Sequence, residues 1–505
     1  MSEAKERTTD SPGWVTTVLG GIERVGNRLP HPVLLFLILS VVLAVASLVM
    51  AAMGLSATLP GDDESVDVRS LISAEGMRFA LTDAVENFVT FPPLGTIVAV
   101  MLGIAVADRS GLLPTLLRVT VLKAPRSMVT LALMLAGVSG SIASDAAYIV
   151  LIPLGAMVFH SLGRNPLVGA VAAYVAVGAG YDASIFVTAT DALLPGITTD
   201  AAAIIDPSVE VNALSNYWFS AVSAIVVAVV GAVVVDKVVT PRAGTYEGPP
   251  GEELEKISGD QIRGLKAAGW TTLVFLVVCA IAWLPPGSPW RDADTGELVP
   301  SPFIEGIAVV LLVGFTAAGY AYGRVTGSIR RAADVPGLMR GGMEDIGNIL
   351  VLFFVIAQFL AYFKWTGIGQ WIAVHGAEVL ERLNAPTPIL LLLSVFLVFG
   401  LGLVITSGSA QWTLLAPVLV PMLMLVGIDP ESTQAAFRIG DSTANVLTPM
   451  SPYFAVALGF LQRYRKDAGI GTLMSMTLPI ALSMLAVWTV LFLLWIVLGI
   501  PLGVG

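Results

Sequence analysis

The stretch "GSAQWTLLAPVLVPMLMLVGIDP" (408–430) decides how this chain folds, because it repeats the earlier stretch "SDAAYIVLIPLGAMVFHSLGRNP" (144–166) without a gap. At one constant offset, aromatic, proline and glycine positions coincide: Tyr148 with Trp412, Pro153 with Pro417, Gly163 with Gly427, and Pro166 with Pro430. Both copies overlap a polar interruption of an apolar block, "GVSGSIASD" (137–145) and "ITSGSAQW" (405–412). An apolar block broken at its middle predicts a re-entrant hairpin, here 127–161 and 388–428.

The rest of the chain has the composition of a membrane protein. Hydrophobic residues make up 56% of its 505 residues and charged residues only 13%, about half the charge fraction of a soluble domain. The first apolar run, 32–54, is longer than 20 residues and lacks a small-residue cleavage site, so it predicts a retained span. Cys279 is the only cysteine, which excludes a disulfide within the chain. Acidic residues gather in loops, and nothing indicates nucleic-acid binding.

Lysine and arginine counts orient the segments, because basic loops stay in the cytoplasm. The basic N-terminal segment 1–31 is placed inside, and "TDALLPGITTDAAAIIDPSVE" (190–210), without Lys or Arg, is placed in an outer loop. The segment 366–383 reads as an amphipathic helix at the outer interface. Nine crossings satisfy the loop charges: 32–54, 88–108, 166–188, 214–239, 266–286, 302–323, 346–364, 433–460 and 470–500.

The same charges place the ends of the first hairpin inside and those of the second outside. The chain is therefore predicted to be an all-α polytopic membrane protein with nine transmembrane helices and two re-entrant hairpins in an inverted-topology repeat. The first repeat is 32–239 and the second is 302–500, with a linker at 240–301 whose span 266–286 reverses the orientation. Interrupted segments in corresponding positions of two inverted halves point to the binding site of a secondary transporter.

The hairpin tips carry small and polar residues. Helix ends leave backbone N–H and C=O groups unpaired, and at membrane depth a ligand can satisfy them. Hydroxyl groups and the positive ends of half-helices suit an anionic group. The candidate tip residues are Ser141, Ser144, Asp145, Ser407 and Gly408.

The stretch "AAFRIGDSTANVLTPMSPYF" (435–454) places charges and two proline pairs inside a predicted span. An ionisable group costs at least about 2.5–3.5 kcal/mol near the centre of a membrane helix, so each is a candidate functional residue. Arg438 and Asp441 are three residues apart and could pair on one helix face, either as a structural ion pair or as part of a substrate or ion site. A guanidinium group also fits a substrate carboxylate bidentately. Asn445 lies on the same stretch.

A second polar region follows "VGAG" (177–180), which predicts a helix break in the partner span. Asp182 and Ser184 lie just after this break, and Asp191 lies near the outer end. Their oxygens suit a hard cation such as Na⁺, with Asp441 and Asp182 as its ligands, or a transferable proton. Trp412, at a hairpin tip, is either a packing aromatic or a surface for stacking a ligand.

The sequence contains no Walker motif, no His/Cys metal cluster and no nucleophile elbow. Direct use of ATP and enzymatic activity are therefore not expected, and no cofactor is predicted. An ion gradient, of Na⁺ or H⁺, is the expected energy source.

Five segments together closely resemble the AbgT family of bacterial inner-membrane transporters, and the resemblance runs over residues 30–500. They are "ASDAAYIVLIPLGAMVFHSLGRNPL", "TDALLPGIT", "AQFLAYF", "GSAQWTLLAPVLVPMLM" and "TQAAFRIGDSTANVLTPMSPYF". The resemblance implies a homodimer in which each protomer pairs a scaffold with a moving transport core. It also implies that the following positions matter for transport: Asp191, Ser409, Trp412, Pro430, Arg438, Asp441 and Pro449.

The chain departs from this family pattern at three places. It has Gly402 where an Asn is usual, Gln411 where a Lys is usual, and Asp182-Ala183-Ser184 where a Ser-Ala-Asn run is usual. Two side-chain amides are thus absent and one carboxylate is gained, which affects the predicted ion stoichiometry.

The resemblance to this family implies gradient-driven transport of p-aminobenzoyl-glutamate-like aromatic carboxylates, together with export of sulfonamide antimetabolites. The expected location is the bacterial inner membrane, with the N-terminus in the cytoplasm. A carrier of dicarboxylates or other organic anions, and a channel, are the alternatives.

Overall fold

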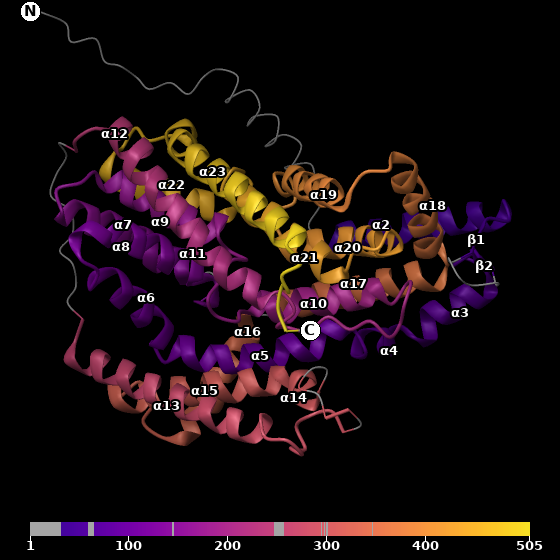
Figure 1. Cartoon of the computed structure of the whole chain (residues 1–505), viewed down its shortest axis with the longest axis horizontal. Coiled ribbons are helices and arrows are strands. Elements are labelled where there is room, and N and C mark those ends of the chain that lie inside the picture. Colours follow the sequence, from indigo (N-terminus) through magenta and orange to yellow (C-terminus); the bar gives the residue numbers. More distant parts are fainter. Residues whose placement is uncertain are drawn as a thin grey trace, which may run out of the picture.

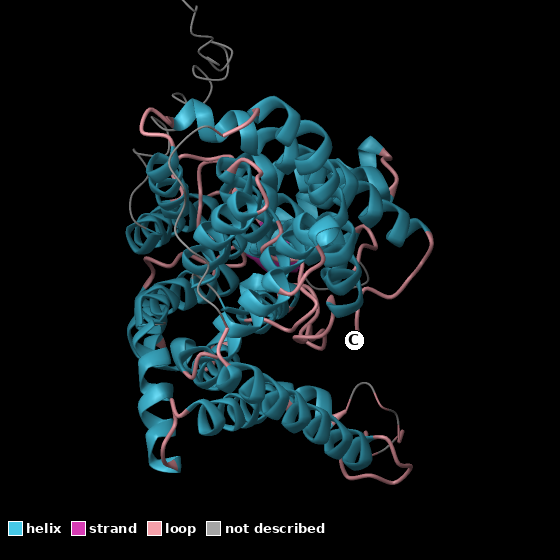
Figure 2. Ribbon diagram, turned by 90° about the vertical axis from the view of Figure 1, so that its left-hand side faces the viewer, coloured by secondary structure: helices cyan, strands magenta, loops and turns pink. Residues whose placement is uncertain are grey.

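The computed structural model describes residues 32–58, 65–143, 146–246, 257–293, 295–296, 298, 301–345 and 347–504. The predicted cytoplasmic segment 1–31 and the tip residues Ser144 and Asp145 lie outside them. Besides loops and turns, the described residues form helices and one small antiparallel sheet, made of β1 (Ser56–Thr58) and β2 (Ser65–Asp67) (Figures 1 and 2).

Eight described helical segments are long and apolar enough to cross a membrane, or nine if the bent pair Leu350–Trp365 and Ile368–Leu383 forms one span. This confirms an all-helical polytopic membrane protein. The eight are Pro32–Ala52, Pro92–Arg109, Arg126–Ala143, Tyr217–Ala243, Gly259–Trp283, Ile307–Thr326, Gly408–Leu425 and Ile470–Val497.

One group of helices forms a frame. In it α13 (Gly259–Trp283) packs on α15 (Ile307–Thr326), and α15 packs on α5 (Pro92–Arg109). Figures 1 and 2 agree in placing α13 and α15 at one edge of the molecule. Elsewhere in the molecule, α2 (Pro32–Ala52) packs on α17 (Gly347–Trp365). Shorter elements complete the frame: α3 (Ala74–Thr82), α4 (Ala84–Val89), α6 (Leu112–Leu122), α14 (Pro302–Glu305), the 3₁₀ turn Ala332–Asp334, α16 (Val335–Asp345) and α18 (Ile368–Leu383).

The first predicted hairpin is a helix, a break and a helix. A 3₁₀ turn, Arg126–Met128, leads into α7 (Val129–Val138); a second turn, Ser139–Ala143, separates it from α8 (Ala146–Ser161). Both arms pack against α9 (Pro166–Ala179), so the chain folds back at the glycine- and serine-rich break. The crossing of α8 and α9 is close because glycines meet there: a Cβ added to Gly169 would lie 2.1 Å from the carbonyl oxygen of Gly155.

The second hairpin has the same construction. Its arms are α19 (Thr387–Gly402) and α20 (Gly408–Leu425), and both pack against α21 (Pro430–Ala444). The break covers only 403–407, so Trp412 lies within α20 and not in the predicted non-helical tip. The predicted interfacial helix 366–383 corresponds to α18, which bends by 69° from the end of α17 and packs on α20.

Two predicted spans are broken helices. Span 166–188 ends as a helix at Ala179, as the "VGAG" sequence predicted, and span 433–460 divides into α21 and α22 (Pro452–Tyr464). The prediction of an outer loop from residue 190 was wrong, because 189–202 form the largely buried helix α10 (Ala189–Ala202). After it come α11 (Tyr217–Val234), a π-helical turn (Val235–Val239) and α12 (Thr240–Ala243); α23 (Ile470–Val497) follows α22.

Contacts between the two halves follow the offset that relates Tyr148 to Trp412. The same offset relates Gly178 to Ser442 and Asp182 to Val446, and each pair contributes to a matching contact. Asp182 is hydrogen-bonded to Ser442, while Val446 lies over Gly178, where an added Cβ would come within 2.3 Å of Val446 Cγ1. The sequence repeat is therefore also a repeat of contacts.

A second matching pair lies where each hairpin approaches its partner helix. Val138 of the first hairpin packs on Gly180, and an added Cβ there would lie 2.6 Å from Val138 Cγ2. At the corresponding positions of the second half, a Cβ added to Gly402 would lie 2.8 Å from Ala444 Cβ. Gly402, one of the departures from the family pattern, thus occupies a place with little room for a side chain.

Candidate functional site

The candidate site lies where the two broken helices face each other. The helices α10, α20 and α21 contact one another there, and α21 also contacts α9 (Figure 1). All residues of α21 except Glu431 are buried, although this helix is polar in composition. A buried polar helix between two helix breaks must satisfy its polar groups within the protein or with a ligand.

Arg438 of α21 forms the central ion pair of the site. Its Nη1 donates to Asp191 Oδ1 of α10 over 2.7 Å, and both side chains are buried. The predicted pairing of Arg438 with Asp441 was wrong, because α10 brings a carboxylate to the guanidinium group from a distant part of the chain. Arg438 Nε has no hydrogen-bond partner among the described residues.

Asp191 also holds the start of α10. Its Oδ2 accepts hydrogen bonds from the backbone N–H of Thr188 over 2.7 Å and from the Thr188 hydroxyl over 2.8 Å. This is a capping box, whose sequence signature is a Thr followed three residues later by an acid. The signal was present in "TATD" (188–191) and predicts a helix start there, but the absence of basic residues favoured a loop.

Asp441, also on α21, lies against the tip of the second hairpin. A Cβ added to Gly408 would lie 2.7 Å from Asp441 Oδ2, so a side chain at position 408 would displace this carboxylate. Asn445 Nδ2 donates to the same oxygen over 3.4 Å. The other oxygen, Oδ1, is buried without a hydrogen-bond partner among the described residues. The structure thus brings together the predicted tip residue Gly408 and the predicted site residues Asp441 and Asn445.

Asp182 reaches the site from the break after α9. Its backbone N–H donates to Ser442 Oγ over 3.1 Å, and the Ser442 hydroxyl donates to Asp182 Oδ2 over 3.1 Å. Ser442 follows Asp441 directly in the chain and was missed as a site residue. The nearby Ser184 is buried, and its hydroxyl accepts a hydrogen bond from the Phe186 N–H over 3.1 Å, which shapes the break.

Trp412 is fully buried and takes part in a chain of polar contacts. Its ring packs at 4.6 Å from that of Phe437, and its Nε1 donates to the Thr198 hydroxyl over 3.0 Å. Thr198 donates in turn to Gln434 Oε1 over 2.6 Å, and Gln434 Nε2 donates to Asn216 Oδ1 over 2.8 Å. Of the two interpretations, a packing aromatic and a ligand-stacking surface, this conformation has the first.

Replacement of Thr198 by valine should lower the melting temperature of the protein. The substitution keeps the shape but leaves the N–H of Trp412 and the carbonyl of Gln434 without a partner, and each unpaired buried group costs about 1–3 kcal/mol. Thermal unfolding followed by intrinsic fluorescence measures the effect. Thr198→Ser is the matched control because it retains the hydroxyl. Equal melting temperatures for the two variants would contradict this role of the hydroxyl.

The remaining predicted residues lie near the breaks. Ser141 is buried in the first tip, and its hydroxyl has no partner among the described residues. Ser407 caps α20, accepting from the Ala410 N–H over 3.4 Å, and its hydroxyl lies 3.3 Å from that of Ser409. Pro430 is the first residue of α21, and Pro449 lies between α21 and α22.

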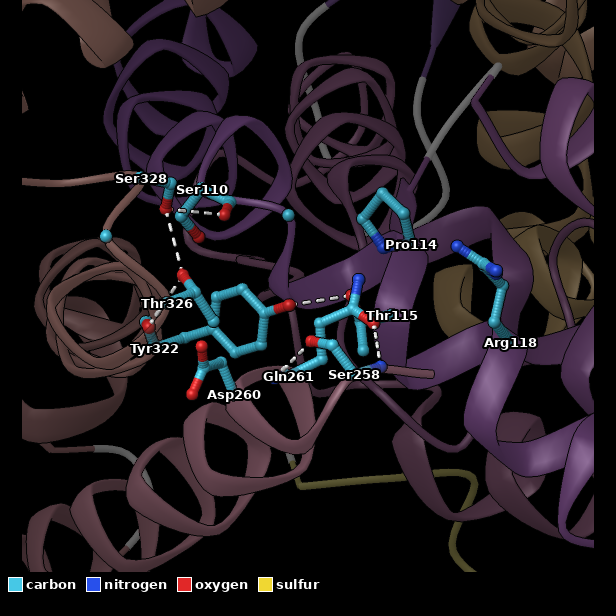
Figure 3. A pocket seen from close by; sticks show the side chains of 12 residues that line it. Ser110, Pro114, Thr115, Arg118, Ser258, Asp260, Gln261, Tyr322, Thr326 and Ser328 are labelled. Carbon is cyan, nitrogen blue, oxygen red and sulfur yellow. Dashed lines mark hydrogen bonds between the residues drawn. The ribbon is translucent and has the colours of Figure 1, made fainter. Parts of the chain in front are cut away.

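One cavity in the described structure lies away from these charges. It has a volume of about 570 Å³ and opens between α6, α13 and α15 (Figure 3). The hydroxyl of Tyr322 lies 2.7 Å from that of Thr115 across it. Arg118, Asp260 and Gln261 also line this cavity, which shares no residue with the site between the breaks.

Comparisons with known proteins agree with the sequence resemblance. Residues 17–505 match the model of the AbgT putative transporter family. The chain is 40% identical over 490 residues to the p-aminobenzoyl-glutamate transport protein of Escherichia coli (strain K12). The aligned residues cover 96% of each protein.

Two solved structures are also similar to this chain, each at 40% sequence identity. The YdaH transporter of Alcanivorax borkumensis superposes with a TM-score of 0.89 over 94% of this chain and 100% of its own. Neisseria gonorrhoeae MtrF, whose structure is described as illuminating a class of antimetabolite efflux pumps, superposes with a TM-score of 0.91 over 97% of this chain and 99% of its own. The buried charges between two broken helices are therefore part of a transporter, and the chain belongs to the AbgT family.

Proposed function

We propose that this protein is an ion-gradient-driven secondary transporter of p-aminobenzoyl-glutamate-like aromatic carboxylates. The observation that carries the proposal is Arg438, a buried guanidinium group on a polar helix that lies between two helix breaks. The name of the E. coli relative supports this substrate class. In the same proposal the protein is a homodimer in the bacterial inner membrane with its N-terminus in the cytoplasm.

The geometry supports a division of roles among the site residues. Asp191 holds Arg438 through Nη1, which leaves the Nε side of the guanidinium group for a substrate carboxylate. The N-terminus of α20, which Ser407 caps, lies against Asp441 of α21, and the N-terminus of a helix favours an anion. Asp441, which touches Gly408, would couple this hairpin to the movement of Na⁺ or H⁺.

We also propose that the same site accepts sulfonamide antimetabolites and that the imposed gradients set the direction of transport. The observation that favours this second substrate class is the similarity to MtrF over nearly the whole of both chains. Sulfonamides share the aminophenyl group of p-aminobenzoyl-glutamate, so an export activity would need no second site.

The test is uptake of radiolabelled p-aminobenzoyl-glutamate into proteoliposomes with an imposed Na⁺ or H⁺ gradient. We expect saturable, gradient-dependent accumulation that unlabelled sulfonamide inhibits. Inhibition by succinate without inhibition by p-aminobenzoyl-glutamate would instead favour a dicarboxylate carrier. Conduction that does not saturate, seen in planar bilayers, would indicate a channel. The absence of any gradient-driven flux of either aromatic compound would contradict the proposal.

A further inference from the structure

The site contains more buried carboxylates than its one cation can neutralise. Asp182 and Asp441 are each 3% exposed, and Asp191 is 7% exposed. Arg438 is the cationic group that lies among them, and its hydrogen bond goes to Asp191. Two buried carboxylates therefore have no cationic partner in contact among the described residues.

Both of these carboxylates present an oxygen that no protein group satisfies. Asp182 Oδ1 and Asp441 Oδ1 are buried without a hydrogen-bond partner in the described structure. Their second oxygens are held, by Ser442 in one case and by Asn445 in the other, so each side chain is fixed in orientation. An ionised carboxylate that is buried without a partner is very costly, and it must bind a proton or a metal cation to remain there.

The two carboxylates are also close neighbours. Ser442, which holds Asp182, follows Asp441 on the same helix, and the two acids interact electrostatically. Arg438 and Asp191 are the other charged groups that affect Asp182, and the Thr190 and Ser442 hydroxyls lie beside it. Two interacting carboxylates take up their cations as a coupled pair.

We propose that Asp182 is a second cation-binding carboxylate, which together with Asp441 holds monovalent cations between α21 and the break after α9. The proposal deepens the proposed function, since it assigns one more transported cation to this site than Asp441 alone would carry. Asp182 is placed to link cation binding to movement of the two repeats. It lies in the helix break itself, and its backbone N–H donates a hydrogen bond to Ser442 of the other repeat.

The first test needs no substrate and uses the full chain in detergent. The melting temperatures of the wild type and Asp182→Asn are compared in NaCl and in choline chloride, at several pH values spanning neutrality. If the cation is Na⁺, Asp182→Asn should weaken Na⁺-dependent stabilisation by about tenfold in concentration, as expected for one lost contact to a charged group. If it is H⁺, NaCl has no effect and the variant changes the pH dependence of melting.

Two further variants separate cation binding from folding. Asp206→Asn removes an exposed carboxylate in the loop after α10 and should respond like the wild type. Ser442→Ala removes the hydroxyl but keeps Asp182, so it should retain a weakened response. An Asp182→Asn protein that responds to Na⁺ and to pH like the wild type overturns the proposal, whether or not p-aminobenzoyl-glutamate is transported.

A second test measures the charge moved per substrate from the reversal potential in voltage-clamped proteoliposomes. The proposal expects one charge fewer in Asp182→Asn than in the wild type, and an unchanged ratio would contradict it. If p-aminobenzoyl-glutamate is not transported at all, the proposed substrate is wrong while the melting experiment still decides the role of Asp182.

Discussion

Replacement of Arg438 by methionine should abolish transport and lower the free energy of unfolding by about 3–5 kcal/mol, the cost of breaking a buried ion pair. The substitution leaves the Asp191 carboxylate buried with only the Thr188 hydrogen bonds. It also removes the guanidinium group proposed to bind the substrate carboxylate, and two lost hydrogen bonds to a charged group reduce affinity by at least about 100-fold. Thermal unfolding and p-aminobenzoyl-glutamate uptake measure the two effects.

The double variant Arg438→Met with Asp191→Asn separates the two effects. Because the side chain at position 191 then carries no charge that has lost its partner, much of the lost stability should return, while transport should stay absent. Arg438→Lys retains the charge but loses the planar fork, so we expect a folded protein with strongly reduced uptake. Near-normal uptake by Arg438→Met would show that Arg438 does not bind substrate.

Replacement of either Gly155 or Gly169 by alanine should prevent normal assembly of the first hairpin on α9. The added methyl group would lie 2.4 Å from the Gly169 oxygen in one case and 2.1 Å from the Gly155 oxygen in the other. These atoms belong to the backbone, so α8 and α9 must separate, and the cost should reach the upper end of the about 1–3 kcal/mol typical of overpacked cores. Yield of monodisperse protein on size exclusion and the melting temperature are the measurements.

Gly269→Ala is the matched control for this experiment. Gly269 lies in α13, where an added Cβ meets nothing within 4 Å, and alanine favours the helix more than glycine does. This variant should be expressed and should melt like the wild type or slightly higher. If the alanine variants at Gly155 and Gly169 behaved in the same way, the two helices would not be held together by close backbone contact.

The hairpins and the broken helices could be predicted because their signals are repeated or local. Each hairpin could be predicted because the same proline pattern occurs twice without a gap. The helix breaks could be predicted because glycines in "VGAG" and the Thr448-Pro449 and Ser451-Pro452 pairs interrupt a helix locally. The helix α10 was missed because a segment without Lys or Arg, with Pro195 inside it, resembles an outer loop. The capping box of Thr188 and Asp191 is a local signal for the start of a helix, and it is stronger evidence than the absence of Lys and Arg.

The partners of the buried charges could not be predicted in the same way. Arg438 has Asp441 three residues away, and helical spacing makes that pair the natural choice. The actual partner, Asp191, comes from a helix whose existence had been missed, so the error in α10 led to the error in the ion pair. Hydrogen bonds such as those of Thr198 with Gln434 join distant segments, and only the folded chain reveals them.

The matching contacts of the two repeats have a consequence for the transport cycle. In a carrier built from inverted halves, the outward-open and inward-open forms arise when the halves exchange conformations, and equal contacts in both halves would give the two forms equal energy. Here one of the two matching contacts joins a carboxylate to a hydroxyl, Asp182 to Ser442, whereas the other places Val446 on Gly178. We therefore expect the resting protein to favour one side of the membrane, with unequal rates for loading and for the empty return.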